Sequence, residues 1–302
     1  MNRARSTKRG VVAGALFLFV FSCATDLPLA PERAEAALPA DASVYLAMRT
    51  GYLDSLIDDI VRSFALEAEE IDDILQDSER VVAAVGSRDS AGAISAAASG
   101  SYPGRRMRFG LTMSRRWRRQ TVDTDISSRP FFEEREGIGE LAVPSGALVL
   151  FSNGGMRQMV QRAALNEPPP DAVALDGDAE LSLLLPRIGE DLQDALPQQA
   201  ARLPLESLSV NVRSRANSDD TLPYELYGTI ELGDEQAARV FSVIARLVIG
   251  SLAEGVPVSE LTVERSGSSI VYGGLPADED RLREWAAGFL GTLGVDRAVE
   301  EA

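Results

Sequence analysis

The densest group of side chains able to do chemistry is a basic cluster between residues 105 and 119. Guanidinium groups bind carboxylates and phosphates through paired hydrogen bonds, and they also stack on indole rings. Such a cluster could hold an anionic headgroup, a phosphorylated glycan or a peptidoglycan carboxylate. The predicted ligand-binding residues are Arg105, Arg106, Arg108, Arg115, Arg116, Trp117, Arg118 and Arg119.

A second interpretation is that these arginines pair with the chain's own acids and bind nothing. Acidic residues are abundant a short distance upstream, at Glu67, Glu69, Glu70, Asp72, Asp73, Asp77 and Glu79. Surface ion pairs of this kind contribute roughly 0–1 kcal/mol each, so they would form an ordinary solvated face. The sequence leaves both interpretations open.

Several kinds of catalysis lack the residues that they need. The chain has no histidine, which excludes Ser-His-Asp and Cys-His nucleophiles and metal sites built on imidazole. Its one lysine, Lys8, lies near the N-terminus in a segment predicted below to be removed. The remaining protein then has no lysine for a Schiff base or a phosphate-binding loop. An enzyme would depend on carboxylates, as in a glycosidase acid pair or a Mg²⁺ or Ca²⁺ site.

The carboxylate patterns themselves favour structural roles. Residues 123–134 place acids at EF-hand positions, but Ser128 replaces the required glycine and Arg129 follows it, which argues against Ca²⁺. Asp176-Gly177-Asp178 is typical of a turn, and Asp278-Glu279-Asp280 of acids at a helix N-terminus. We therefore predict no metal and no cofactor.

Cys23 is the single cysteine, and the segment before it has the layout of a secretory signal. Four basic residues precede an apolar run over 11–21, and Ser22 is a small residue at the cleavage point. The run is about half as long as a membrane-spanning helix requires. Val20-Phe21-Ser22-Cys23 resembles the lipobox of bacterial lipoproteins, whose cysteine carries a diacylglyceryl group and fatty acids such as palmitate. We predict a signal peptide over 1–22 and lipidation at Cys23; the alternative is an ordinary signal peptide with an incidental cysteine.

The net charge of the chain limits the classes of partner that we expect. The chain has 30 basic and 46 acidic residues, and removing residues 1–22 leaves 26 basic and 46 acidic residues, a net charge of −20. Such a surface repels nucleic-acid phosphates and has no general attraction to anionic lipid. Attachment to a membrane must then come from the N-terminal acyl chains. We expect the membrane as one partner, an envelope protein or anionic envelope ligand as another, and no nucleic acid.

Prolines predict two breaks in the chain. Residues 24–38 contain two prolines and no sustained hydrophobic period, which favours a lipid-proximal tether over 23–38. Pro168-Pro169-Pro170 can neither continue a helix nor enter the interior of a sheet, which predicts a linker over 166–170. The two units expected on either side are residues 39–165 and 171–302.

The two halves carry the same order of hydrophobic patterns. Strands are expected near 43–49, 81–85 and 93–98 in the first half and near 181–185, 207–213 and 224–232 in the second. Helices are expected over 53–64, 105–117, 156–165, 188–203, 235–252 and 278–290. Glu140-Leu141-Ala142-Val143 has a counterpart in Glu260-Leu261-Thr262-Val263. We predict an α+β fold of two tandem ferredoxin-like (βαββαβ-containing) repeats, each sheet covered by helices on one face.

These halves, and the opening segment over 38–47, are similar in style to uncharacterised bacterial exported lipoproteins with duplicated α+β domains. The resemblance implies no activity. Ala24 rather than Asp follows the cysteine, which by resemblance to lipoprotein sorting signals implies the outer membrane if the cell has one. We expect a lipid-anchored cell-envelope protein that binds or scaffolds, with a carboxylate-only hydrolase of envelope glycans as the alternative. Two carboxylates about 5–10 Å apart, one with a raised pKa, would favour the enzyme; an Arg-lined or apolar groove without them would favour binding.

Overall fold

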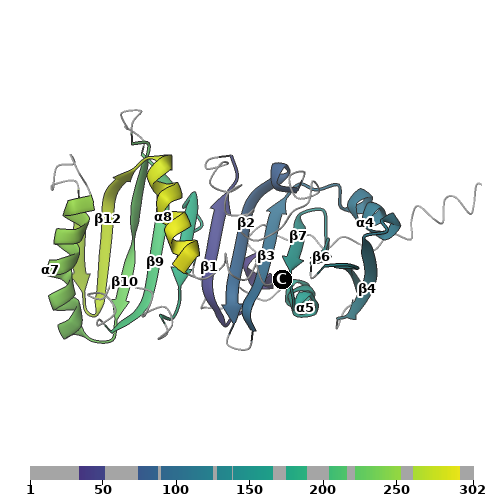
Figure 1. Ribbon diagram of the computed structural model, residues 1–302, viewed down its shortest axis with the longest axis horizontal. Helices are drawn as coiled ribbons and strands as arrows, with labels where there is room; N and C mark the ends of the chain where they lie inside the picture. The colour runs from purple at the N-terminus through teal and green to yellow at the C-terminus, as the bar shows by residue number, and fades with distance from the viewer. Residues whose placement is uncertain are drawn as a thin grey trace, which may run out of the picture.

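The computed structural model describes residues 34–51, 74–87, 90–124, 128–137, 139–165, 175–188, 204–215, 222–252 and 261–292. The strands of these residues form one antiparallel sheet of 12 strands, which runs from one end of the molecule to the other (Figure 1). In spatial order the strands are β11-β12-β10-β9-β8-β1-β2-β3-β7-β6-β5-β4. Among the described residues, no helix is both long and apolar enough to cross a membrane.

The strands of the first half are β1 (Ala42–Arg49), β2 (Ser78–Ser87), β3 (Ser90–Gly100), β4 (Trp117–Asp123), β5 (Ser128–Glu134), β6 (Glu140–Ala142) and β7 (Leu148–Ser152). Those of the second half are β8 (Leu181–Leu185), β9 (Leu205–Ser214), β10 (Tyr224–Leu232), β11 (Thr262–Ser266) and β12 (Ser269–Ala277). The helices are η2 (Glu35–Ala37), α4 (Gly104–Met113), α5 (Met156–Leu165), α7 (Glu235–Leu252) and α8 (Glu279–Thr292).

The two faces of the sheet have separate apolar cores. One core receives side chains from α4, α7 and α8 and extends from Trp117 on β4 to Tyr272 on β12. The other core lies under α5 and η2, against the opposite face of the first half. Because side chains alternate between faces along a strand, β1 supplies both cores, with Leu46 and Met48 in the first and Tyr45 and Ala47 in the second.

The centre of the sheet is the antiparallel pair β1–β8, in which Tyr45 pairs with Leu184 and Met48 with Leu181. Tyr45 is fully buried there, and its hydroxyl donates a hydrogen bond to the carbonyl of Pro39 at 2.6 Å. A strand that is buried on both faces belongs in the interior of a sheet. β1 therefore joins the two halves and does not form an edge of either.

The prediction of two tandem ferredoxin-like repeats is wrong. The β1–β8 pairing continues one sheet through both halves, all of its strand pairs are antiparallel, and helices cover both faces. The hydrophobic period of a strand shows which side chains are buried, but it does not show which strand lies next to it. Both edges at the centre were free to pair, and pairing them satisfies a row of backbone groups that two separate sheets would expose.

The strand order outward from the centre is nevertheless the same in both directions, β1-β2-β3-β7-β6 and β8-β9-β10-β12-β11. The first half alone continues, through β5 and β4. The helices predicted over 53–64 and 188–203 and the linker over 166–170 lie outside the described residues. Ala34, Ala37 and Leu38 are buried beneath α5, so residues 34–38 of the predicted tether belong to the packed core.

Candidate functional site

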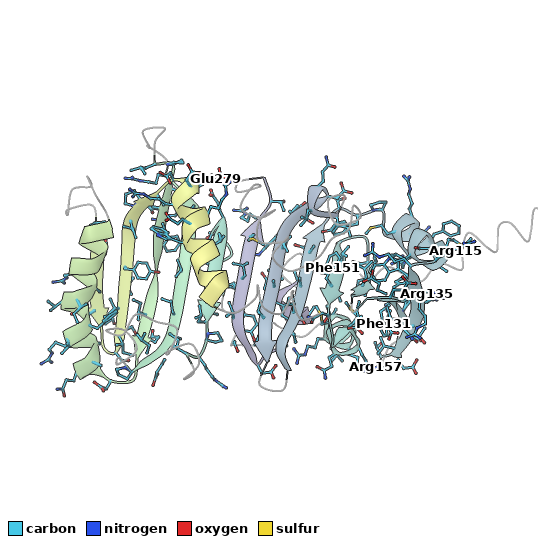
Figure 2. The ribbon with its side chains drawn as sticks, viewed as in Figure 1. Arg115, Phe131, Arg135, Phe151, Arg157 and Glu279 are labelled. Atoms are coloured by element: carbon cyan, nitrogen blue, oxygen red, sulfur yellow. The ribbon has the colours of Figure 1, made fainter. Side chains whose placement is uncertain are left out.

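The arginine cluster lies at one end of the sheet and is divided between a helix and an edge strand. A helix was predicted over 105–117; the structure has α4 ending at Met113, and Trp117 already begins β4. Residues 114–116 form a connection in place of the last predicted helical turn, and residues 117–123 are a strand because they pair along their whole length with β5. Figure 2 shows Arg115, in the connection, at the same end of the molecule as Arg135, which follows β5.

Three of the predicted residues are held by the protein itself. The Arg108 guanidinium donates a hydrogen bond to the carbonyl of Val143 at 2.9 Å. Arg116 pairs with Glu134 at 2.6 Å, and Arg118 pairs with Glu133 at 2.5 Å. These pairs partly support the interpretation of a self-paired face, although the acids lie on β5 and not upstream of the cluster.

Trp117 lies in the core and does not form a surface platform. Its side chain is 9% exposed, and the Arg116 guanidinium carbon lies 5.6 Å from the ring centroid. Its indole N–H is buried and has no hydrogen-bond partner among the described residues. The ring is therefore not accessible for stacking on a ligand, which was its predicted role.

The remaining members of the cluster, Arg105, Arg106, Arg115 and Arg119, are exposed. Arg106 also borders a cavity of about 450 Å³ beside α4. The cavity wall is mainly apolar and contains a few polar groups. Its residues are Ile74, Gln76, Asp77, Tyr102, Pro103, Arg106, Met107, Gly110, Leu111 and Leu141. Pockets of this size with an apolar wall and a few polar groups are typical of small-molecule sites.

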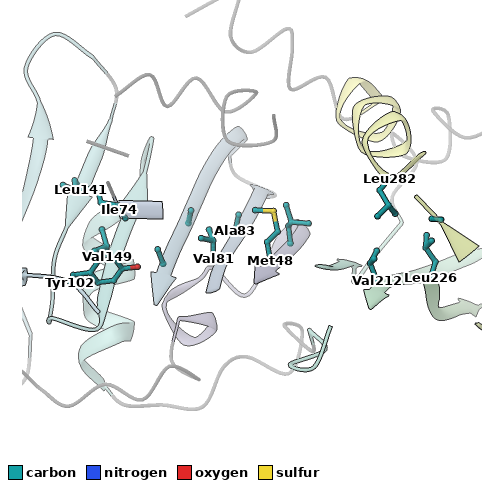
Figure 3. Packing of buried hydrophobic residues seen from close by; sticks show 14 of the residues in the cluster. Met48, Ile74, Val81, Ala83, Tyr102, Leu141, Val149, Val212, Leu226 and Leu282 are labelled. Atoms are coloured by element: carbon teal, nitrogen blue, oxygen red, sulfur yellow. The ribbon is translucent and has the colours of Figure 1, made fainter. Parts of the chain in front are cut away.

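Tyr102 is a buried polar group of the cavity whose hydroxyl is fixed by a hydrogen bond. Its hydroxyl lies 2.8 Å from the hydroxyl of Ser78, which itself donates to the carbonyl of Ile74 at 2.6 Å. Tyr102 therefore donates to Ser78. Burial raises the pKa of Tyr102 to about 12, so the group is a neutral donor and no general base at physiological pH. Figure 3 shows Tyr102 beside Ile74 and Val149 in the same apolar cluster.

The cavity brings Arg106 together with residues that the sequence did not predict as a site. In the sequence Tyr102 lies just before the helix predicted over 105–117, and Leu141 stood out only as part of the motif over 140–143. The available signal was the position of Tyr102 immediately before the basic helix. Ile74 reaches the cavity through the tertiary fold and carried no signal, and Asp77 was considered only as one of several acids that could pair with the arginines.

Glu133, next to the cluster, lacks the raised pKa that the acid of a glycosidase pair needs. Hydrogen bonds from Gln120 and Arg118 lower the pKa of Glu133, which keeps it ionised, whereas a general acid needs a raised pKa. Within the described part of the chain, no three Asp, Glu, His or Cys residues are grouped closely enough to hold a metal ion. The segment considered as an EF-hand is the β4–β5 hairpin, with residues 125–127 outside the described residues.

Comparison with known proteins bears on the fold alone. No protein-family model matches the chain, and no curated protein matches its sequence. Three crystal forms of TP0453 are similar in structure. Form I has a TM-score of 0.57 and 17% identity over 83% of this chain and 95% of that one. Form III has a TM-score of 0.56 and 16% identity over 83% and 96%, and form IV a TM-score of 0.55 and 17% identity over 85% and 96%.

Proposed function

We propose that this protein is a lipid-anchored component of the cell envelope that binds an anionic envelope molecule in the cavity beside α4. The observation that carries the proposal is the cavity of about 450 Å³, with Arg106 on an otherwise mainly apolar wall. A cation at the edge of an apolar pocket favours a ligand with an anionic group on an apolar body. Asp77 on the same wall disfavours a bare polyanion, since like charges repel.

The anchor rests on the sequence around Cys23. Its lipobox-like context makes it the acceptor of the acyl chains, and the mature charge of −20 offers no electrostatic alternative for attachment to anionic lipid. Residues 24–33 would then connect the lipid to Ala34, the first residue that the structure describes and one that is buried in the core. Ala24 favours the outer membrane if the cell has one.

In the described part of the chain, neither of the carboxylates with a displaced pKa favours the hydrolase alternative. Besides Glu133, the pKa of Asp176 is displaced: burial raises it, but hydrogen bonds from the Tyr227 hydroxyl and the backbone N–H of Asp178 outweigh burial, and the net pKa is lowered. Both carboxylates are thus held in the ionised form, and neither suits the acid of a glycosidase.

Membrane fractionation tests the anchor. Wild-type protein should remain with the membranes through an alkaline wash, and Cys23→Ser should move to the soluble fraction, because an apolar run of this length cannot hold the protein as a span. A Cys23→Ser variant that stays in the washed membranes would contradict the proposed lipidation.

The cavity is tested with 8-anilinonaphthalene-1-sulfonate, a fluorescent probe with an anionic group on an apolar body. Binding to the wild type should weaken on Arg106→Glu, which reverses the charge at the cavity, and on Leu111→Trp, which fills it. Arg105→Glu is the matched control, since Arg105 is exposed on the same helix and is not part of the cavity wall. Equal losses for Arg105→Glu and Arg106→Glu would show that the probe senses only the overall charge of α4.

A further inference from the structure

The two ends of the sheet differ in how their open edges are covered. At one end β11 has five residues, lies against α7, and its Val263 carbonyl accepts a hydrogen bond from Arg246 of that helix at 3.2 Å. At the other end β4 has seven residues, lies beside α4 and α5, and pairs with β5 without a bulge. An uncovered edge strand presents a row of free N–H and C=O groups to any extended chain that approaches.

The hydrogen bonds of β5 show which backbone groups of β4 face outward. The N–H of Glu134 donates to Gly139, on the side of β6, at 2.8 Å, so Glu134 turns its backbone away from β4. Trp117, which pairs with Glu134, must then turn its own backbone away from β5. The direction of the backbone N–H and C=O groups alternates along a strand. Those of Arg119, Thr121 and Asp123 therefore also point away from β5.

Pro130 agrees with this alternation. Pro130 lies opposite Thr121, in a pair that makes no hydrogen bonds between β4 and β5. Proline suits this position because it has no backbone N–H to donate. No hydrogen bond from a described helix or loop is made to the backbone of Arg119, Thr121 or Asp123. The Trp117 carbonyl is approached by the Arg135 guanidinium at 3.5 Å, so the open edge begins at Arg119.

The charge beside this edge selects the kind of strand that can join it. Arg115 and Arg119 are exposed and form no ion pair with any described residue. Side chains on a strand added to β4 would lie about 4.5–5.5 Å from those of β4. A second copy of β4 would bring a second arginine cluster to the edge, which is unfavourable, whereas acidic side chains would be attracted.

We propose that the outer edge of β4 binds an extended, acidic, proline-free segment of a partner protein by strand addition. The backbone of Arg119, Thr121 and Asp123 supplies the hydrogen bonds, and Arg115 and Arg119 supply the preference for acidic side chains. This mode of recognition separates affinity, which comes from the main chain, from specificity, which comes from the side chains. The site differs from the cavity, which β4 does not line.

The test is the anisotropy of a fluorescein-labelled peptide in which Glu and Thr alternate over eight residues, titrated with the full-length protein. Thr121→Pro removes an outward N–H that the fold does not use, and proline is tolerated on edge strands, so the variant should fold. It should weaken binding about tenfold, the loss expected for one or two hydrogen bonds. Arg119→Glu should weaken it similarly, and thermal unfolding verifies that each variant is folded.

Arg265→Glu, an equal charge reversal on the opposite edge strand, is the matched control and should leave binding unchanged. Arg106→Glu should also leave it unchanged, which separates this site from the cavity. The proposal is overturned if the peptide does not bind, or if a version N-methylated at alternate residues binds equally well, since attraction of charge would then suffice. It is also overturned if the protein forms a dimer that Thr121→Pro dissociates, because the edge would then belong to a second copy.

Discussion

Replacing Met48 by alanine tests whether the two halves of the sheet unfold as one unit. Met48 lies on β1, is 2% exposed, and pairs with Val81 on β2 and Leu181 on β8. Its side chain belongs to the apolar core that continues into the second half, where Val212 lies (Figure 3). A cavity made at this position would weaken the packing on both sides of the β1–β8 pair.

The expected loss follows from burial. Met→Ala substitutions in cores cost about 2–5 kcal/mol, which combines lost transfer free energy with the cavity that remains. The neighbouring strands are fixed by hydrogen bonds on both sides of β1, so the site cannot collapse far and the cost should be about 3–4 kcal/mol. With an m-value near 3 kcal/mol per molar urea, the midpoint should fall by about 1 M.

The assay is urea unfolding followed by far-UV circular dichroism and by tryptophan fluorescence. Trp117 and Trp285 lie in different halves, so the two signals together report on the whole sheet. Both should give one transition at one midpoint, and the midpoint should shift as a whole in Met48→Ala. Met113→Ala is the matched control, because Met113 is 68% exposed on α4 and its loss should change the midpoint by less than about 0.2 M.

Two separate transitions, with Met48→Ala shifting only the one that belongs to the first half, would refute the reasoning. The β1–β8 pair would then hold the halves side by side without coupling their stability. A loss no larger than that of Met113→Ala would refute the packing itself.

Gly228→Ala should cost about 1–3 kcal/mol, because the added Cβ would clash with the Ser209 carbonyl oxygen, and thermal unfolding measures the loss. Tyr45→Phe removes a buried hydrogen-bonded hydroxyl and should cost about 1–2 kcal/mol in urea unfolding; no loss would show that the bond contributes nothing net. The lowered pKa of Asp176 makes its contribution present above the unfolded value of about 3.9 and lost as pH falls through the folded pKa. The difference in urea midpoint between wild type and Asp176→Asn should therefore be constant above about pH 5 and shrink below pH 4, and a difference that grows on acidification would contradict the bond from Tyr227.

Much of the local structure could be predicted from the sequence, because apolar residues recur at regular helical or strand spacing in several segments. The helices predicted over 235–252 and 156–165 correspond to α7 and α5, and the alternation over 207–213 lies within β9. The β4–β5 hairpin was missed, because residues 117–123 are mostly polar and show no apolar alternation. Strand pairing, and not hydrophobic period, decides their conformation.

The candidate site was predictable only in part. The basic cluster was visible in the sequence as a run of arginines. The sequence did not show that Arg108, Arg116 and Arg118 form hydrogen bonds or ion pairs with other groups of the protein. Trp117 was expected beside a ligand because an indole near arginines suits stacking; the fold instead buries it in the core. The partner of a side chain depends on long-range contacts that spacing along the chain does not specify.

The sequence by itself determined which side-chain chemistry this protein lacks and where its strongly amphipathic elements form. A chain without histidine excludes imidazole chemistry in any fold, and the amphipathic period of a helix depends only on its own residues. Tertiary structure alone decided that one sheet passes through both halves, that Arg106 meets Tyr102 at a cavity, and that β4 is the last strand at one end of the sheet. The physical reason is that a strand's backbone bonds equally well to many neighbours, so its partner is chosen by how the whole set of apolar faces can be buried together.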